Sequence, residues 1–429
     1  MSLLISFCPI FLFVVLYVGA GIYFSLMGIE NSFYQLSPNV AVIPGIVLAW
    51  IIHKGPTKHR FDQFIDGVRH KDIITMCIIF ILAGAFSTVT SAIGSVDATI
   101  HFGLSIIPQD YLLIGLFLIA AFISTAIGTS MGTIATIAPI AAGLASQGAF
   151  PATLGLATIV GGAMFGDNLS IISDTTIASV SSQEAKMKDK FKLNAMIALI
   201  SSFITIIVLL FVHDTQTFIE PKPYNFMLVT PYLFLIIFAM TGVNVFIVLL
   251  LSILYAGIIG YIHHDYSILD LSKDVAIGFK SMHDIMLLSL LIGGLSGLSQ
   301  KGSKQLAQKL GDWISKKGSK RFAQLIIAKI VSIFDILLAN NTVAIIVSGE
   351  IAREIAKKHH VPPHYSATIL AIFSCVFQGI IPYGAQLLLA ASVAGLSPLS
   401  LVPYVYYCYI LGAVTIMFIL VKKPTKEAH

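Results

Sequence analysis

Long apolar runs separated by short polar connections fill the whole chain. A helix needs about 20 mostly apolar residues to cross the hydrocarbon core of a bilayer, and most of the runs approach that length. They lie near residues 3–24, 38–52, 73–94, 111–127, 130–147, 153–179, 193–212, 226–241, 243–262, 284–300, 322–339, 342–356, 365–395 and 400–421. This pattern predicts an all-α, polytopic integral membrane protein with about 12–14 membrane segments.

Two stretches, 111–147 and 322–356, are short for two full crossings each. Each stretch can form either two short spans or one re-entrant hairpin. Both arrangements return the chain to the side that it left, so the sequence leaves both open.

The composition excludes several classes of protein. Of the 429 residues, 57% are hydrophobic and 11% are charged, whereas a soluble protein has about 25% charged residues. These values exclude a soluble enzyme and a nucleic-acid-binding protein. The four cysteines lie in apolar runs without a Cys-x-x-Cys pair, so we expect no cofactor and no metal beyond a bound Na⁺.

Basic residues gather in a few connections between the runs. Of 26 Lys and Arg residues, 22 lie within 53–72, 181–192, 301–321, 353–358 and 422–426. All five clusters fall on the same side as the N-terminus when the runs are counted as crossings. Because cytoplasmic loops are enriched in Lys and Arg, we predict that both termini are cytoplasmic.

The second half of the chain resembles the first. A shift of 212 residues aligns residues 128–130 with 340–342. Each half, 1–213 and 214–429, has an odd number of crossings, so the second half would sit upside down relative to the first. We therefore predict one integrated membrane domain built of two inverted repeats with broken helices or re-entrant hairpins, and a site near the midplane between them.

The most polar stretch inside an apolar run is 166–176. Asp167 and Asp174 are seven residues apart, so a regular helix would place both on one face. Gly161 and Gly162 weaken the helix before them, and we expect an unwound or bent segment there. Freed carbonyls and side-chain oxygens suit protons and small cations. The candidate ligands of an ion or proton in this stretch are Asp167, Asn168, Ser170, Ser173, Asp174 and Thr175.

Three further polar stretches interrupt the runs. Small and hydroxyl residues at 128–133 predict either close helix packing or a hairpin tip. Asp335 is a third candidate carboxylate for the ion or proton. Gly, Pro and Gly break the run between Gln378 and Gln386. Because glutamine cannot titrate, the second half would coordinate the ion or substrate with neutral groups, whereas the first half would carry the charge. The candidate substrate-binding residues are Thr129, Ser130, Asn340, Asn341, Thr342, Gln378 and Gln386.

These motifs resemble a known family. The segments 165–176, 81–86 with 94–99, 339–342 and 378–386 are similar to the signature of the NhaC-type sodium/proton antiporters. The resemblance implies a bacterial inner-membrane protein that exchanges cytoplasmic Na⁺ for external H⁺, with Asp167 and Asp174 as the leading carboxylates. Ile171 stands where the family commonly has proline, which indicates a divergent branch.

Two functions follow, and neither is enzymatic. The first is a Na⁺/H⁺ antiporter in which the two ions compete for one carboxylate site. The second is a Na⁺- or H⁺-coupled carrier of an amino acid or organic carboxylate, since the resemblance extends to NhaC-like proteins that move organic substrates. A pocket with room for several heavy atoms would favour the second. The expected partners are the lipid bilayer and a small cation or organic substrate, without nucleic acid, and a homodimer is possible.

Overall fold

The computed structural model describes residues 8–421, except for residues 28, 30–34, 53–55, 107, 172, 213–221, 242, 264–265 and 315–318. Only the backbone is described for residues 25, 72, 109, 127, 239–240 and 299–314.

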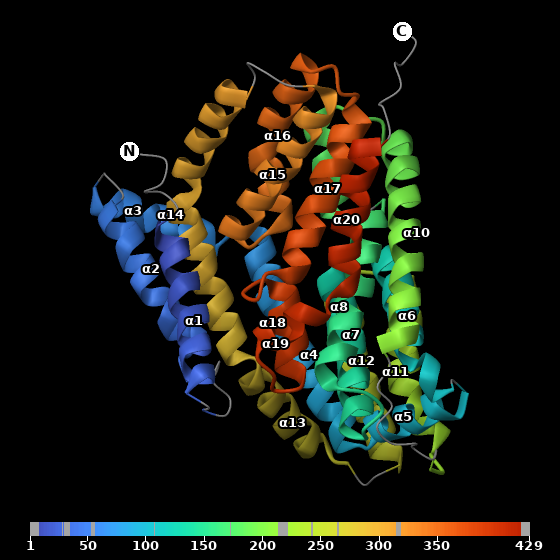
Figure 1. Ribbon diagram of the computed structural model, residues 1–429. Helices are drawn as coiled ribbons and strands as arrows, with labels where there is room; N and C mark the ends of the chain where they lie inside the picture. Colours follow the sequence, from blue (N-terminus) through green and yellow to red (C-terminus); the bar gives the residue numbers. More distant parts are fainter. Residues whose placement is uncertain are drawn as a thin grey trace.

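All regular elements of the described residues are helices (Figure 1). The first half contains α1 (Cys8–Leu26), α2 (Pro38–Ile52), α3 (Thr57–Val68), α4 (Lys71–Ala92), α5 (Ser95–Ile106), η3 (Gln109–Tyr111), α6 (Leu112–Ile127), α7 (Ser130–Ser146), α8 (Ala152–Leu169), α9 (Asp174–Gln183) and α10 (Met187–Val212). The second half contains α11 (Phe226–Met240), α12 (Val245–His263), α13 (Ile268–Ser281), α14 (His283–Ile314), α15 (Lys320–Leu338), α16 (Asn341–Lys358), α17 (Pro363–Ile380), α18 (Ala385–Val393), α19 (Pro398–Leu401), η4 (Val402–Tyr404) and α20 (Tyr406–Val421).

The apolar runs of the sequence coincide with these helices or with consecutive pairs of them, so the all-α prediction is confirmed. Five described helices are long and apolar enough to cross a membrane, or seven if each of two bent pairs counts as one span. Five shorter apolar helices accompany them. The apolar pattern did not predict α3, α5 and α13, and α14 continues as a helix into the basic stretch, as far as Ile314.

The outer surface of the bundle is apolar, as expected for a protein surrounded by lipid. Helix α10 shows the arrangement clearly. Phe203 and Phe211 are 65% and 84% exposed on it, whereas its polar residues Asn194 and Ser201 are buried. The apolar face of this helix therefore points outward and its polar face points into the protein.

The two stretches that the sequence left open form hairpins, α6–α7 and α15–α16. Ser124, near the end of α6, donates a hydrogen bond to the carbonyl of Ala163 in α8 at 2.6 Å. Tyr383 donates to the carbonyl of Ile336, near the end of α15, at 2.7 Å. Each hairpin tip thus lies beside a broken span, as a re-entrant hairpin would, and the choice between a re-entrant hairpin and two short spans stays a prediction.

The two hairpins occupy opposite ends of the bundle. In Figure 1, α15 and α16 lie toward the end where both termini are marked, and α6 and α7 lie toward the other end. In each half a hairpin is followed by a broken span, α8–α9 or α17–α18. This order agrees with the predicted repeats, 1–213 and 214–429, whose inverted symmetry stays a prediction.

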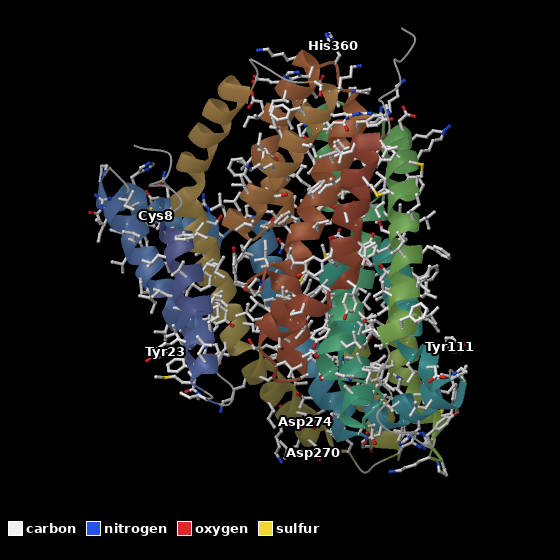
Figure 2. All side chains as sticks on the ribbon, in the orientation of Figure 1. Cys8, Tyr23, Tyr111, Asp270, Asp274 and His360 are labelled. Atoms are coloured by element: carbon white, nitrogen blue, oxygen red, sulfur yellow. The ribbon has the colours of Figure 1, made fainter. Side chains whose placement is uncertain are left out.

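The two ends of the bundle can be recognised by labelled side chains. Figure 2 shows His360, just after the basic end of α16, at the end where the termini lie. Asp270 and Asp274 of α13 lie at the opposite end. Tyr111, which follows the stretch 95–110 without Lys or Arg, also lies toward that opposite end.

Candidate functional site

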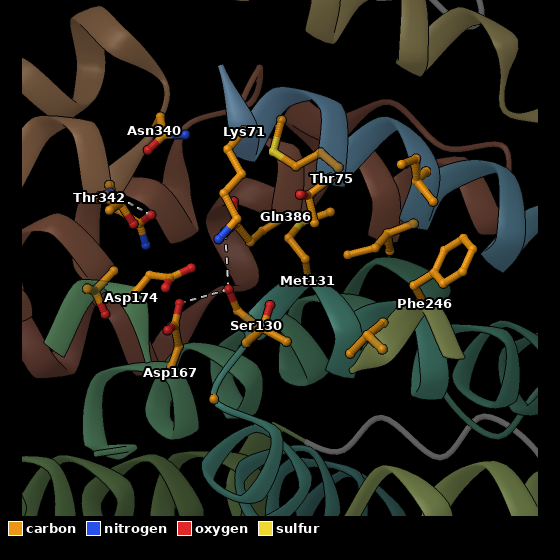
Figure 3. A pocket seen from close by; sticks show the side chains of 18 of the residues that line it. Lys71, Thr75, Ser130, Met131, Asp167, Asp174, Phe246, Asn340, Thr342 and Gln386 are labelled. Carbon is orange, nitrogen blue, oxygen red and sulfur yellow. Dashed lines mark hydrogen bonds between the residues drawn. The ribbon is translucent and has the colours of Figure 1, made fainter. Parts of the chain in front are cut away.

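Four interruptions of helices meet at one pocket with a volume of about 680 Å³ (Figure 3). Two are the hairpin tips, at 128–130 and 339–342, and two are the breaks between α8 and α9 and between α17 and α18. The polar residues that line the pocket are Lys71, Thr75, Thr129, Ser130, Asp167, Asp174, Thr175, Asn244, Asn340, Asn341, Thr342, Gln378 and Gln386. Both halves of the chain therefore contribute to one site.

The break between α8 and α9 places Asp167 at this pocket. Helix α8 ends at Leu169, and Ser170 and Ser173 have extended backbones before α9 begins. The predicted interruption of the helix is therefore present. Gly166 lies so close to α6 that a Cβ at this position would collide with the backbone nitrogen of Thr125. This close approach brings the end of α8 against the hairpin tip that carries Ser130.

Asp167 is held by two serine hydroxyls. Its side chain is 5% exposed. Ser130 donates to Oδ2 at 2.9 Å and Ser173 donates to Oδ1 at 2.5 Å. Among the described side chains, none of the ion pairs involves Asp167. A carboxylate held only by neutral donors keeps room for a mobile proton or cation to neutralise it.

A chain of hydrogen bonds joins Asp167 to the second half. Gln386 Nε2 donates to Ser130 Oγ at 3.1 Å, and Gln378 Nε2 donates to Gln386 Oε1 at 2.7 Å. Gln378 Nε2 also lies 3.4 Å from the carbonyl of Ala339, at the other hairpin tip. Ser130 therefore accepts from the second half while it donates to the carboxylate of the first (Figure 3).

Asp174 differs from Asp167 although both line the pocket. It is the first residue of α9 and its side chain is exposed. A carboxylate in the first turn also interacts favourably with the positive end of the helix dipole. Because the break interrupts the helix, the seven-residue spacing gives one buried and one exposed carboxylate instead of an equivalent pair on one helical face.

The asparagines at the second hairpin tip bond to the first turn of α16. Asn340 Oδ1 accepts from the backbone N–H of Val343 at 2.9 Å, and Asn341 Oδ1 accepts from that of Thr342 at 2.9 Å. Asn340 is thus the N-cap of α16. Helix capping by Asn340 and the local bond of Asn341 each account for one acceptor site of the side chain, and both residues also line the pocket.

The structure brings ten of the predicted site residues to the pocket and leaves four outside its lining. Of these four, Ser173 still contacts Asp167. Asn168 is fully buried and its oxygens accept from Asn194 of α10. Ser170 is buried, and Asp335 is fully buried in α15.

The sequence did not single out three polar residues that line the pocket: Lys71, Thr75 and Asn244. Lys71 begins α4 and belongs to a basic cluster, so the pattern placed it with the connections that orient the protein. Asn244 stands alone in an apolar stretch just before α12, and its Oδ1 accepts from the N–H of Phe246 in the first turn of that helix. The packing of α4 against α7, and of Val245 at the start of α12 against Gly132 of α7, brings these residues to the pocket.

Broken helices and hairpin tips that meet at one pocket are typical of secondary transporters. Comparison with known proteins agrees. Residues 1–213 match the model of the Na⁺/H⁺ antiporter family. The chain is 24% identical over 406 residues, 86% of its length and 88% of the relative's, to the Na⁺/H⁺ antiporter NhaC of Bacillus subtilis (strain 168).

The names of two other relatives mention organic substrates. The malate-2H⁺/Na⁺-lactate antiporter of Bacillus subtilis (strain 168) is 23% identical over 80% of each chain. The arginine/ornithine antiporter ArcD of Halobacterium salinarum (strain ATCC 700922 / JCM 11081 / NRC-1) is 25% identical over 33% of this chain and 30% of its own. The protein is a multi-pass secondary transporter and not an enzyme. The chain is similar to NhaC-type Na⁺/H⁺ antiporters over most of its length, so the resemblance seen in its motifs is confirmed.

Proposed function

We propose that this transporter exchanges Na⁺ for H⁺ at the carboxylate of Asp167. One observation carries the proposal: Asp167 is buried at the meeting point of the four interruptions, and only neutral hydroxyls hold it among the described side chains. A carboxylate in such surroundings is costly to leave charged and unpaired. A proton or a sodium ion would each remove that cost.

Ser130 and Ser173 can hold Asp167 both when it is an ionised carboxylate and when it binds a cation. A hydroxyl can donate to an ionised carboxylate, and it can also rotate and offer its oxygen to a cation. Carboxylate and hydroxyl oxygens are hard ligands that suit small cations. Because H⁺ and Na⁺ compete for the same oxygens, binding one releases the other, and that competition couples their flows.

Transport also requires that the site open to each side in turn. The bond between Gln386 and Ser130 crosses from one half of the chain to the other beside Asp167. A relative movement of the halves would lengthen this contact and change the surroundings of the carboxylate. We propose that alternating access uses this boundary between the halves.

Exchange by purified protein in liposomes tests the proposal. Proton flux is followed with a pH-sensitive dye while Na⁺, Li⁺ or K⁺ is added. Asp167→Asn should abolish Na⁺-dependent proton release because an amide cannot give up a proton. Asp97→Asn is the matched control, since Asp97 is exposed and outside the pocket lining. Wild-type exchange by Asp167→Asn would exclude this carboxylate from the mechanism.

An organic substrate is the second candidate, and the size of the pocket favours it. About 680 Å³ lies within the range of small-molecule sites, roughly 300–1,000 Å³, and exceeds the needs of one dehydrated Na⁺. Lys71 and Asp174 line the same pocket and supply both charges that a zwitterion would require. The names of the malate/lactate and arginine/ornithine relatives point to such solutes.

The same liposomes separate the two candidates. Amino acids and small carboxylates are added in turn, and uptake of the labelled compound is measured with and without a sodium gradient. Saturable uptake that Lys71→Gln weakens would establish the organic carrier. Na⁺-dependent proton flux that none of the added organic compounds changes would support cation exchange as the single function.

We further propose that the protein lies in a bacterial plasma membrane with both termini cytoplasmic. The positive-inside rule supports this orientation, since the basic end of α16 and both marked termini lie at one end of the bundle. Single cysteines at Lys58 and Asp270 in a cysteine-free background test it. An impermeant reagent added outside should label position 270 and not position 58.

A further inference from the structure

Lys190 is buried although its neighbours on α10 are exposed. The side chain is 1% exposed, whereas Lys188 and Lys192 are exposed to the surroundings of the protein. Its ammonium Nζ donates to Thr176 Oγ1 at 2.8 Å and to the carbonyl of Asn168 at 3.4 Å. These two acceptors lie on opposite sides of the break between α8 and α9, so Lys190 bridges the interruption.

The acceptors of this ammonium are neutral oxygens. Among the described side chains, none of the ion pairs involves Lys190. Asn168 lies in the last turn of α8, where the carbonyls carry the negative end of the helix dipole. A carbonyl and a hydroxyl at the end of a helix are the ligands that a small hard cation prefers.

A further oxygen lies close to the same carbonyl. Asn194 follows Lys190 by one turn of α10, and its Nδ2 donates to the carbonyl of Asn168 at 2.5 Å. Asn194 is 1% exposed, and its Oδ1 is buried without a hydrogen-bond partner. Such an unsatisfied acceptor calls for an explanation. It makes no hydrogen bond to the Lys190 ammonium, so a cation would have to lie closer to Asn194 than Nζ does to use it as a ligand.

We propose that the break between α8 and α9 contains a second cation site, separate from Asp167, and that the ammonium of Lys190 is its resident occupant. The tethered cation neutralises the carbonyl end of α8 and holds α8 to α9. Because the lysine fills the position, a sodium ion has no place there in the native chain. Lys190 is thus a positioning residue that leaves Asp167 as the position for a mobile cation.

The proposal predicts that removing the ammonium opens the position to sodium. Asp167→Asn serves as the background, so that Na⁺ binding at the carboxylate does not contribute to the measurement. The thermal midpoint Tm of the purified full chain is measured in NaCl and in choline chloride at equal ionic strength. Binding of ²²Na⁺ is measured on the same samples, which gives a readout that does not depend on transport.

Lys190→Gln in this background should lower Tm in choline chloride by several degrees. Na⁺ should restore most of the loss, with a gain that grows with the logarithm of its concentration, as for any ligand of the native state. The doubly substituted chain should bind close to one additional sodium ion. Lys190→Arg keeps a cation at the position, so its Tm should stay independent of Na⁺. Lys192→Gln is the matched control and should leave Tm unchanged in both salts.

Three results would overturn the proposal. One is equal recovery of Tm in sodium and choline chloride, which would show an effect of ionic strength alone. Another is a Lys190→Gln chain that does not fold in either salt, which would make Lys190 a purely structural bridge. The third is Na⁺-dependent stability in Asp167→Asn with Lys190 intact, which would show that the lysine does not occupy the site. None of these outcomes depends on whether Asp167 exchanges ions.

Discussion

The two broken spans have the same construction and opposite chemistry. In each, a helix ends at the pocket, four residues interrupt it, and a shorter helix continues beside a hairpin tip. The break after α8 presents the carboxylate of Asp167 with two serine donors. The break after α17 presents Gln378 and Gln386, bonded to each other. One break can therefore take up and release a proton, and the other can only donate and accept hydrogen bonds.

The hairpin tips differ in a similar way. Gly128 ends α6 in the left-handed region at φ 77°, where glycine is favoured, and Ser130 beside it offers a hydroxyl to Asp167. Ala339 ends α15 at φ 49°, and Asn340 beside it caps α16. The first tip therefore donates a hydrogen bond to the carboxylate of Asp167, whereas the side chain of Asn340 at the second tip bonds to the backbone of its own helix. We infer that the group that gains and loses charge lies in the first half, and that the second half lines the pocket with neutral groups.

The strongest test of this comparison is the loss of the buried carboxylate. Asp167→Asn should lower the rate of coupled exchange by roughly 100-fold or more, equivalent to about 2.7 kcal/mol in barrier height. Asp174→Asn should cost roughly 10-fold or less, because Asp174 is exposed in the first turn of α9. Proton-coupled flux across pH 6 to 9 measures both. Equal losses would mean that the two carboxylates act as a unit and that burial does not distinguish them.

Neutral side chains of the second break should matter less. Gln386→Ala removes one donor to Ser130 and one acceptor from Gln378. A neutral hydrogen bond contributes about 0.5–1.5 kcal/mol, so the apparent affinity for the transported ion or substrate should fall by roughly 2- to 10-fold. The concentration dependence of transport measures this change. Leu389→Ala on the same helix is a packing control away from the pocket lining. Complete loss of exchange in Gln386→Ala would contradict a merely supporting role for the second half.

The positions of all four interruptions could be predicted from the sequence because their signals are local. Glycine, proline and polar residues within an apolar run weaken a helix wherever the run packs. The helices are interrupted within 166–176 and 378–386, as expected. The sequence alone gives little sign that the four interruptions meet at one pocket, because that meeting depends on packing between segments more than 200 residues apart. Only the weak internal repeat indicated that the two halves share a site.

Lys190 shows what the local pattern missed. Lys186, Lys188 and Lys192 surround it in sequence, so the stretch 181–192 was interpreted as a basic connection. The polar residues Lys190, Asn194, Ser201 and Thr205 recur at helical spacing through an otherwise apolar run, which is the signal of a polar face turned inward. This polar face of α10 indicates that Lys190 lies inside the protein.

The cap at the second hairpin tip should affect stability more than transport. Asn340→Asp keeps an acceptor for the N–H of Val343, whereas Asn340→Ala leaves that donor without its cap. Loss of an N-cap costs about 0.5–2 kcal/mol, so Asn340→Ala should lower Tm, and Asn340→Asp should keep it. If capping is the main task of Asn340, the folded Asn340→Ala protein should transport at close to the wild-type rate. A large loss of transport without a change in Tm would assign the side chain to the substrate instead.

The smallest effect is expected at Asp335, the carboxylate of the second half. It is fully buried, it lies outside the pocket lining, and neither of its oxygens has a side-chain hydrogen-bond partner in the described part of the chain. An ionised carboxylate in such a place would be very costly, so the uncharged acid is the cheaper form. Asparagine has nearly the same shape and is also uncharged. Asp335→Asn should therefore change transport by no more than about twofold, or ~0.4 kcal/mol, and Asp335→Ala should destabilise the protein by leaving a cavity. Transport and Tm measured side by side separate these effects. If Asp335→Asn instead abolished exchange as Asp167→Asn is expected to do, the second half would also carry a titrating group, and the contrast between a charged and a neutral half would no longer hold.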